Sequence, residues 1–223
     1  MNNREENNWL ASIFLPRYLE WVEQLKSSGN NLVRYTSAAT ALRILKHHEI
    51  WMRNTRCMND FLEVKYGINL FKNLCRRPEF IQLRCLWKPG QSRWSGDIAG
   101  YWRIWLLDKH TYIACFSEHI REENQYGRLS MWRGYGSDSS VAFVLKPDLF
   151  ITENNFFDIY TSPVEYLDQN QFFELIKLLT IRISSEKAFL ESLPVSLIIQ
   201  WVKHMVQFAV VSIKHPVFKE ERE

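Results

Sequence analysis

Four short segments of this chain combine charged, hydroxyl-bearing and aromatic side chains in patterns that are typical of ligand sites. They cover residues 34–37, 58–63, 115–119 and 131–136. Each segment also has a purely structural explanation. Chemistry therefore follows only if the fold brings several of them to one place.

Arg34, Tyr35 and Thr36 end an apolar stretch and lead straight into a segment that reads as a helix capped by Ser37. A guanidinium donates two parallel hydrogen bonds to a phosphate or carboxylate, and a helix N-terminus also favours negative charge. This arrangement predicts an anion site. The alternative is a surface arginine beside a core tyrosine.

Asn59 and Asp60 precede a second predicted helix, and Glu63 follows within its first turn. Asn and Asp at this position are first of all helix caps. Asp60 and Glu63 also share a helix face, so the same residues could present a pair of carboxylates to a substrate.

Two further segments carry polar or aromatic groups at the ends of predicted strands. Ser117 and His119 lie where a strand ends, which is a common position for site residues, but no G-x-S-x-G motif supports a serine nucleophile. Trp132 and Tyr135 lie three residues apart in a glycine-containing connection. They could stack on a planar ligand, and they fit equally well as core aromatics.

Composition excludes several classes of protein. A net charge of +3 implies no general field for nucleic acid or membranes. The four cysteines have no C-x-x-C spacing, which indicates buried free thiols in a reducing compartment. No signal peptide or membrane-spanning run is present, so we expect a cytoplasmic protein with no membrane partner. P-loop, dinucleotide-fold, zinc-protease and EF-hand motifs are absent, and no metal is predicted.

The periodicity predicts helices and strands in an α+β order. Helices are expected over 8–28 with a break at Pro16, over 38–48, after residue 60, over 171–183, and over 186–213 with a break at Pro194; strands are expected over 32–37, 50–54, 111–118, 141–146 and within 156–167. This order predicts a mixed or antiparallel sheet flanked by helices. We expect an N-terminal helical appendage, residues 1–30, and one domain over 31–223.

Three ordered motifs resemble a widespread bacterial family known only as a domain of unknown function, number 2971. The stretch LVRYTSAATALRILKHHEIWMRNTRCMNDFLE is similar to its opening, IACFSEH…MWRGYGSDSSVAFVLK to its middle, and IKHPVFKEERE to its last motif, which begins at Lys214. Phe61 and Ser139-Ser140 depart from the family pattern. The family motif continues past Glu223 with Trp-Arg and a closing strand, so we expect a domain without its last strand.

The layout of that family also looks like ADP-ribosyltransferases, which implies NAD as a substrate. Under this analogy Arg34 holds the diphosphate, Tyr35 or Trp132 stacks on the ligand, and Glu221 or Glu223 supplies the catalytic carboxylate. Thr36, Asn59, Asp60, Glu63, Ser117, His119, Tyr135 and Lys214 would line the ligand site. If the last residues are extended, Glu221 and Glu223 point to the same side. A solvated charged terminus is the alternative for these glutamates.

Three hypotheses about function follow. The first is an NAD-consuming transferase or glycohydrolase, acting as a toxin or phage-defence effector on an unidentified acceptor. The second is a non-enzymatic module that senses a nucleotide or binds a protein. The third is a metal-dependent nucleic-acid-processing enzyme that uses Asp60, Glu63 and the late glutamates.

Overall fold

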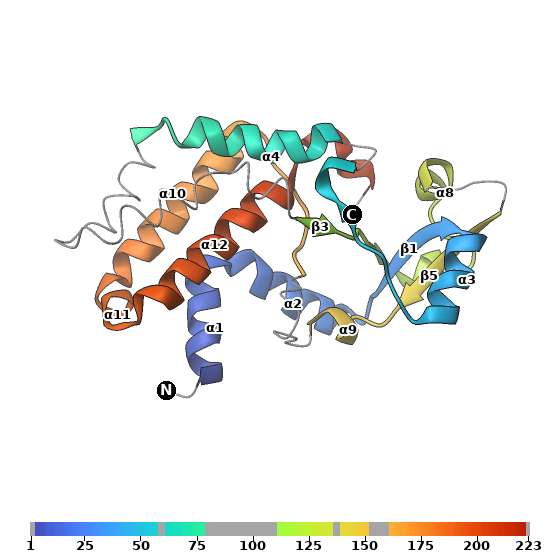
Figure 1. The fold of residues 1–223 in the computed structure, drawn as a ribbon, viewed down its shortest axis with the longest axis horizontal. Coiled ribbons are helices and arrows are strands. Elements are labelled where there is room, and N and C mark those ends of the chain that lie inside the picture. Colours follow the sequence, from blue (N-terminus) through green and yellow to red (C-terminus); the bar gives the residue numbers. More distant parts are fainter. Residues whose placement is uncertain (1–2, 58–60, 79–110, 136–138, 152–160, 222–223) are drawn as a thin grey trace.

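The fold is α+β, with small sheets flanked by helices (Figure 1). The computed structural model describes residues 3–57, 61–78, 111–135, 139–151 and 161–221. In Figure 1 the long helices gather on one side of the molecule, and the main sheet with short helices beside it lies on the other.

Two helices open the chain, and proline sets the break between them. α1 spans Asn3–Phe14 and α2 spans Pro16–Ser28. Pro16 has no backbone N–H to continue α1, but its fixed backbone angle suits the first position of α2. The break predicted at Pro16 is therefore confirmed. Gly29 then ends α2 in the left-handed conformation, with φ of 65°.

The main sheet is built around β1, Asn31–Ser37, which pairs antiparallel with β4, Ser117–His119, and with β5, Ser140–Leu145. The strand order is β4-β1-β5. Arg34 lies opposite Phe143 in this register. β1 leads directly into α3, Ala38–His47, whose first turn is capped by the Ser37 hydroxyl accepting from the Thr40 N–H, as the sequence indicates.

Two small strand pairs complete the described sheets. β2, Arg53–Asn54, pairs antiparallel with β3, Tyr112–Ile113, and β6, Glu165–Tyr166, pairs parallel with β7, Ile213–Lys214. The predicted strands over 50–54 and 111–118 are too long. The second is divided between β3 and β4, because its two ends pair with different partners.

Besides α1 and α2, three long helices and one short helix of the described residues form the helical side. α4 is Phe61–Leu74, α10 is Gln169–Ser185, α11 is Lys187–Ser192 and α12 is Val195–Val211. The break near Pro194 is confirmed. Short elements fill the connections: η1 Thr55–Cys57, η2 Arg121–Glu123, α8 Leu129–Tyr135, α9 Asp148–Ile151 and η4 Pro216–Glu221.

The larger core joins both ends of the chain. Leu10 and Phe14 of α1 pack in one cluster with Phe71 of α4, Phe172 of α10 and Ile198 of α12. Gly67 of α4 lets that helix approach the backbone of α12 at Val210, where a Cβ would collide with the carbonyl oxygen. A smaller cluster lies at the main sheet, between Val33, Tyr35 and Met131.

Two expectations about local structure are wrong. Residues 131–135 belong to α8 rather than to a loop, because Met131 and Trp132 pack on β1 and hold a helical turn there. The last long helix ends at Val211, five residues before Pro216, because Ile213 and Lys214 enter the ladder with β6. Pro216 instead opens η4, so the chain is helical rather than extended as far as Glu221.

None of the three described cysteines forms a disulfide, but they are not buried. Cys57 is exposed, and Cys75 and Cys115 are half-buried. The expectation of buried thiols is therefore wrong for these residues. Cys85 lies outside the described residues.

Candidate functional site

Two faces of the main sheet have different chemistry, because successive side chains of β1 point to opposite sides. Tyr35 and Val33 face α8. Arg34 lies between them in sequence and therefore faces the other side, as does Thr36. The structure thus separates Arg34 from Tyr35 and Trp132, which the sequence had grouped as one site.

The face toward α8 brings together four of the predicted site residues, Tyr35, Ser117, His119 and Trp132. The Tyr35 and Trp132 rings meet edge to face, with their centroids 4.7 Å apart. The Tyr35 hydroxyl accepts the backbone N–H of Arg128 at 2.8 Å, and the Trp132 indole N–H donates to the Tyr126 carbonyl at 2.8 Å. Both rings therefore have structural partners.

His119 and Ser117 are buried on the same face. One ring nitrogen of His119 lies 2.9 Å from Asn124 Oδ1, and the Ser117 hydroxyl contacts the sulfur of Met131 at 3.9 Å. Arg128 joins this group through a 2.9 Å ion pair with Glu123. The Ser117 and His119 side chains are thus engaged in packing and internal hydrogen bonds. This arrangement stabilises the turn from β4 to α8.

The opposite face presents Arg34. Its guanidinium carbon lies 5.7 Å from the centre of the Phe116 ring, and its Nη1 atom is buried without a hydrogen-bond partner. Burial lowers the pKa of Arg34; the Cys115 thiol opposes this shift, and the neighbouring Arg53 adds to it. Among the described residues, no carboxylate forms an ion pair with Arg34.

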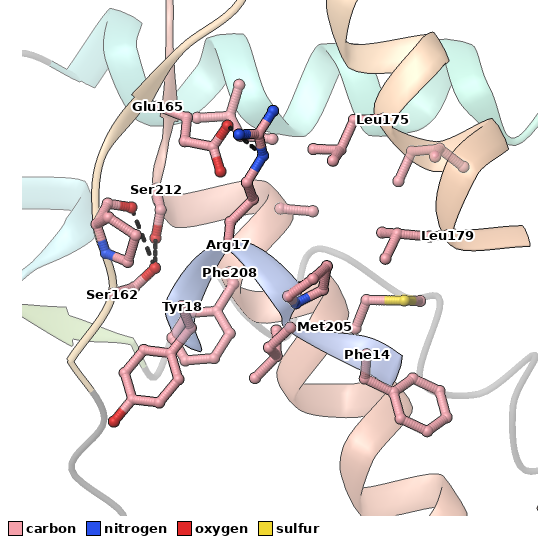
Figure 2. Close-up of a pocket in the computed structure, with 16 residues that line it drawn as sticks. Phe14, Arg17, Tyr18, Ser162, Glu165, Leu175, Leu179, Met205, Phe208 and Ser212 are labelled. Atoms are coloured by element: carbon pink, nitrogen blue, oxygen red, sulfur yellow. Dashed lines mark hydrogen bonds and ion pairs between the residues drawn. The ribbon is translucent and has the colours of Figure 1, made fainter. Parts of the chain in front are cut away.

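A third candidate is a pocket at the junction of α1 and α2 (Figure 2). Its walls come from that junction, from α10 and α12, and from the segment around β6. Phe14, Leu179 and Met205 are among the apolar side chains that line it. Arg17 and Glu165 meet at one side, with Arg17 Nε 3.9 Å from Glu165 Oε2. On another side the Ser162 and Ser212 hydroxyls are hydrogen-bonded at 2.9 Å.

The remaining predicted site residues lie away from the two faces of the main sheet and from the pocket, or fall outside the described residues. Tyr135 is the last residue of α8 and is 47% exposed, while Lys214 is buried in β7. Glu63 lies in α4 and Glu221 ends η4, but only their backbone is described. Asn59, Asp60 and Glu223 lie outside the described residues. η4 lies close to α8, the helix that carries Trp132.

Several residues on the two faces of the main sheet and in the pocket were not predicted from the sequence. Arg53 and Phe116, beside Arg34, carry no local motif, and neither do Glu123 and Arg128. Arg53 is placed by the pairing of β2 with β3, and Phe116, Glu123 and Arg128 flank β4, which pairs with β1. Arg17 had a signal, since it directly follows the helix break at Pro16. Its partner Glu165 is far away in sequence, so the pocket could not be foreseen.

The part of the chain that the structure describes holds neither a cluster of metal ligands nor a helix that could span a membrane. No group of three or more His, Cys, Asp or Glu side chains there could hold a metal ion. None of the helices described is both long enough and apolar enough to cross a bilayer.

Comparison with known sequences supports the family resemblance for the C-terminal part of the chain. Residues 131–223 match a family described as "Protein of unknown function (DUF2971)". This stretch begins in α8 and includes β5, α10, α12 and the acidic end of the chain, so the chain is similar to that family over its C-terminal part. No curated protein matches the chain, and no solved structure does.

Proposed function

We propose that the chain binds the phosphate groups of a nucleotide at Arg34, and that the nucleotide is NAD, which it consumes by transfer of ADP-ribose or by hydrolysis. The observation that carries this proposal is the buried Nη1 atom of Arg34, which has no hydrogen-bond partner. A charged donor left unsatisfied inside a protein is costly, and such groups occur where a ligand completes them.

The surroundings of Arg34 favour a phosphate over a neutral ligand. Burial is the main cause of the lowered pKa of Arg34, and the positive charge of Arg53 contributes to it, so a second cation lies in the surroundings of Arg34. Phe116 offers its ring to one side of Arg34. A phosphate would accept hydrogen bonds from the fork of the guanidinium and neutralise both charges.

In the enzymatic form of the proposal, the carboxylate is Glu221 or Glu223. When the bond between nicotinamide and ribose breaks, nicotinamide leaves with the bonding electron pair, and positive charge develops on the ribose. A nearby carboxylate stabilises that charge and takes the proton of the attacking water or acceptor hydroxyl. η4 contacts α8, which covers the face of the sheet opposite to Arg34, so this contact does not bring the glutamates to Arg34. The role of the glutamates rests on the analogy with ADP-ribosyltransferases.

A second candidate is a module that binds the nucleotide without consuming it. It is favoured by the positions of Tyr35 and Trp132, the two side chains that were expected to stack on the ligand. They pack against each other on the face of the sheet opposite to Arg34. A site without them retains phosphate binding but lacks the expected stacking surface for the nicotinamide.

Calorimetric titration with NAD and with ADP-ribose tests the binding step. We expect Arg34→Gln to bind both at least about tenfold more weakly, since a hydrogen bond to a charged group contributes roughly 1.5–3 kcal/mol. Arg121→Gln is the control, because it removes the same charge from an exposed position of η2. Equal affinity of the two variants, or no binding of either nucleotide to the unmodified chain, would refute the site.

Chromatographic detection of nicotinamide then separates the two candidates. Release that is lost in Glu221→Gln, with NAD binding retained, supports the enzyme. Binding through Arg34 without release supports the sensing module.

A further inference from the structure

The α1–α2 pocket is an apolar hollow with a charged mouth, and nothing in the proposed function uses it. Its volume is about 70 Å³, and its lining is predominantly apolar. Figure 2 shows Leu175, Leu179 and Met205 on one side of the hollow, and Arg17 and Glu165 together at another. The Tyr18 and Phe208 rings stack at its edge, with centroids 6.5 Å apart.

The size of the pocket limits the ligand. A single water molecule needs at least about 10–15 Å³ of such volume, so this hollow has space for several non-hydrogen atoms. A nucleotide or a lipid tail is therefore too large. A short hydrocarbon chain fits, and water makes few hydrogen bonds to a lining of this kind, which favours an apolar occupant.

The charges at the mouth favour a cation. Glu165 lies 3.9 Å from Arg17, and Glu20 lies 3.5 Å from the same guanidinium, so two carboxylates share one arginine. Both contacts are longer than the usual distance for a charge-assisted hydrogen bond. Burial raises the pKa of Glu165; Arg17 opposes this shift, and the nearby Glu20 adds to it. Glu165 is the more enclosed partner of its pair, with a side chain 22% exposed against 58% for Arg17.

We propose that the α1–α2 pocket binds a short aliphatic amine, with its hydrocarbon chain among Leu175, Leu179 and Met205 and its ammonium group on Glu165. The ammonium gives Glu165 a close counter-ion, which the long contact with Arg17 does not supply. The Ser162 and Ser212 hydroxyls form the polar part of the rim. This site is separate from Arg34 and does not depend on the proposed function.

Butylamine is the probe, and the methyl carbon signal of Met205 in NMR is the readout, since Met205 lines the pocket. The titration is made at about pH 8, which favours the ionised form of a carboxyl with a raised pKa while an alkylamine is still charged. We expect a saturable shift of this signal with a dissociation constant in the millimolar range, because only a few methylene groups are buried. Methylamine, which lacks the chain, and butanoate, which lacks the positive charge, should bind far more weakly.

Matched variants identify the carboxylate. Glu165→Gln keeps the shape and should weaken butylamine binding about tenfold or more, as expected for loss of a charge partner. Glu174→Gln removes a charge from an exposed position of α10 and should leave binding unchanged. Arg17→Ala removes the competing cation and should tighten it.

Three results would overturn the proposal. They are the absence of a saturable shift at Met205, equal binding of butanoate and butylamine, and equal binding by Glu165→Gln and the unmodified chain. If Glu165→Gln does not fold, weaker butylamine binding by Arg17→Ala overturns the proposal as well.

Discussion

Replacement of Gly67 by alanine tests how closely α4 packs against α12. A Cβ at this position would lie against the carbonyl oxygen of Val210 and 2.9 Å from its carbonyl carbon. Carbon atoms in ordinary contact lie about 3.5–4.0 Å apart, so the two helices must separate by the order of 1 Å. The obstacle is helix backbone, which cannot rotate away as a flexible side chain can.

The expected loss of stability is about 2 kcal/mol. Overpacking of a core costs about 1–3 kcal/mol, and a backbone obstacle places this substitution at the upper end. Alanine is favoured over glycine in a helix by about 1 kcal/mol, which offsets part of the cost. For a chain of this length, a loss of about 2 kcal/mol lowers the melting temperature by about 4–8 °C.

Thermal unfolding followed by far-UV circular dichroism measures the effect. Gly134→Ala is the matched control, because Gly134 also lies in a helix, α8, and no atom lies within 4 Å of its added Cβ. We expect the control to melt at or slightly above the temperature of the unmodified chain. If Gly67→Ala melts as high as the control, the close approach of α4 and α12 is wrong.

Three further predictions concern single side chains. Tyr35→Phe removes the acceptor of the Arg128 N–H and should lower the free energy of unfolding by about 1–3 kcal/mol in urea titrations; an unchanged midpoint would contradict the contact. Ser37→Ala removes the cap of α3 and should cost about 1 kcal/mol in the same assay, whereas Ser37→Gly should cost only a few tenths. The third concerns Glu165, whose folded-state pKa is raised, so the unmodified chain should lose stability as pH rises through that pKa. The Glu165→Gln variant cannot ionise at this position. The difference between its melting temperature and that of the unmodified chain should therefore increase from about pH 4 to pH 7. A difference that stays constant over this range would contradict the raised pKa.

The local breaks and caps were readable from the sequence because they depend on a few neighbouring residues. Pro16 ends α1 and Pro194 separates α11 from α12, since proline removes a backbone donor wherever it stands. Ser37 caps α3 through a hydrogen bond within its own first turn. The α+β class followed from the order of these elements.

The helical state of residues 129–135 was not readable in the same way. This segment is short and contains Gly134, so its own helix propensity is weak. It is helical because Met131 and Trp132 pack against Val33 and Tyr35, almost a hundred residues earlier. Contacts at such separations leave no periodic pattern in the sequence.

The candidate sites show the same difference between local sequence features and contacts that form only on folding. The sequence by itself determined which side chains could bind an anion or stack on a ring, but the prediction grouped Arg34 with Tyr35 although neighbouring residues of a strand point to opposite faces. Only the tertiary structure decided that α8 covers the face of Tyr35, and that Arg34 lies beside Arg53 and Phe116. It also brought Glu165 to Arg17 across most of the chain. The physical reason is that side-chain type and backbone constraint are local, whereas burial and charge pairing depend on the neighbours that folding supplies.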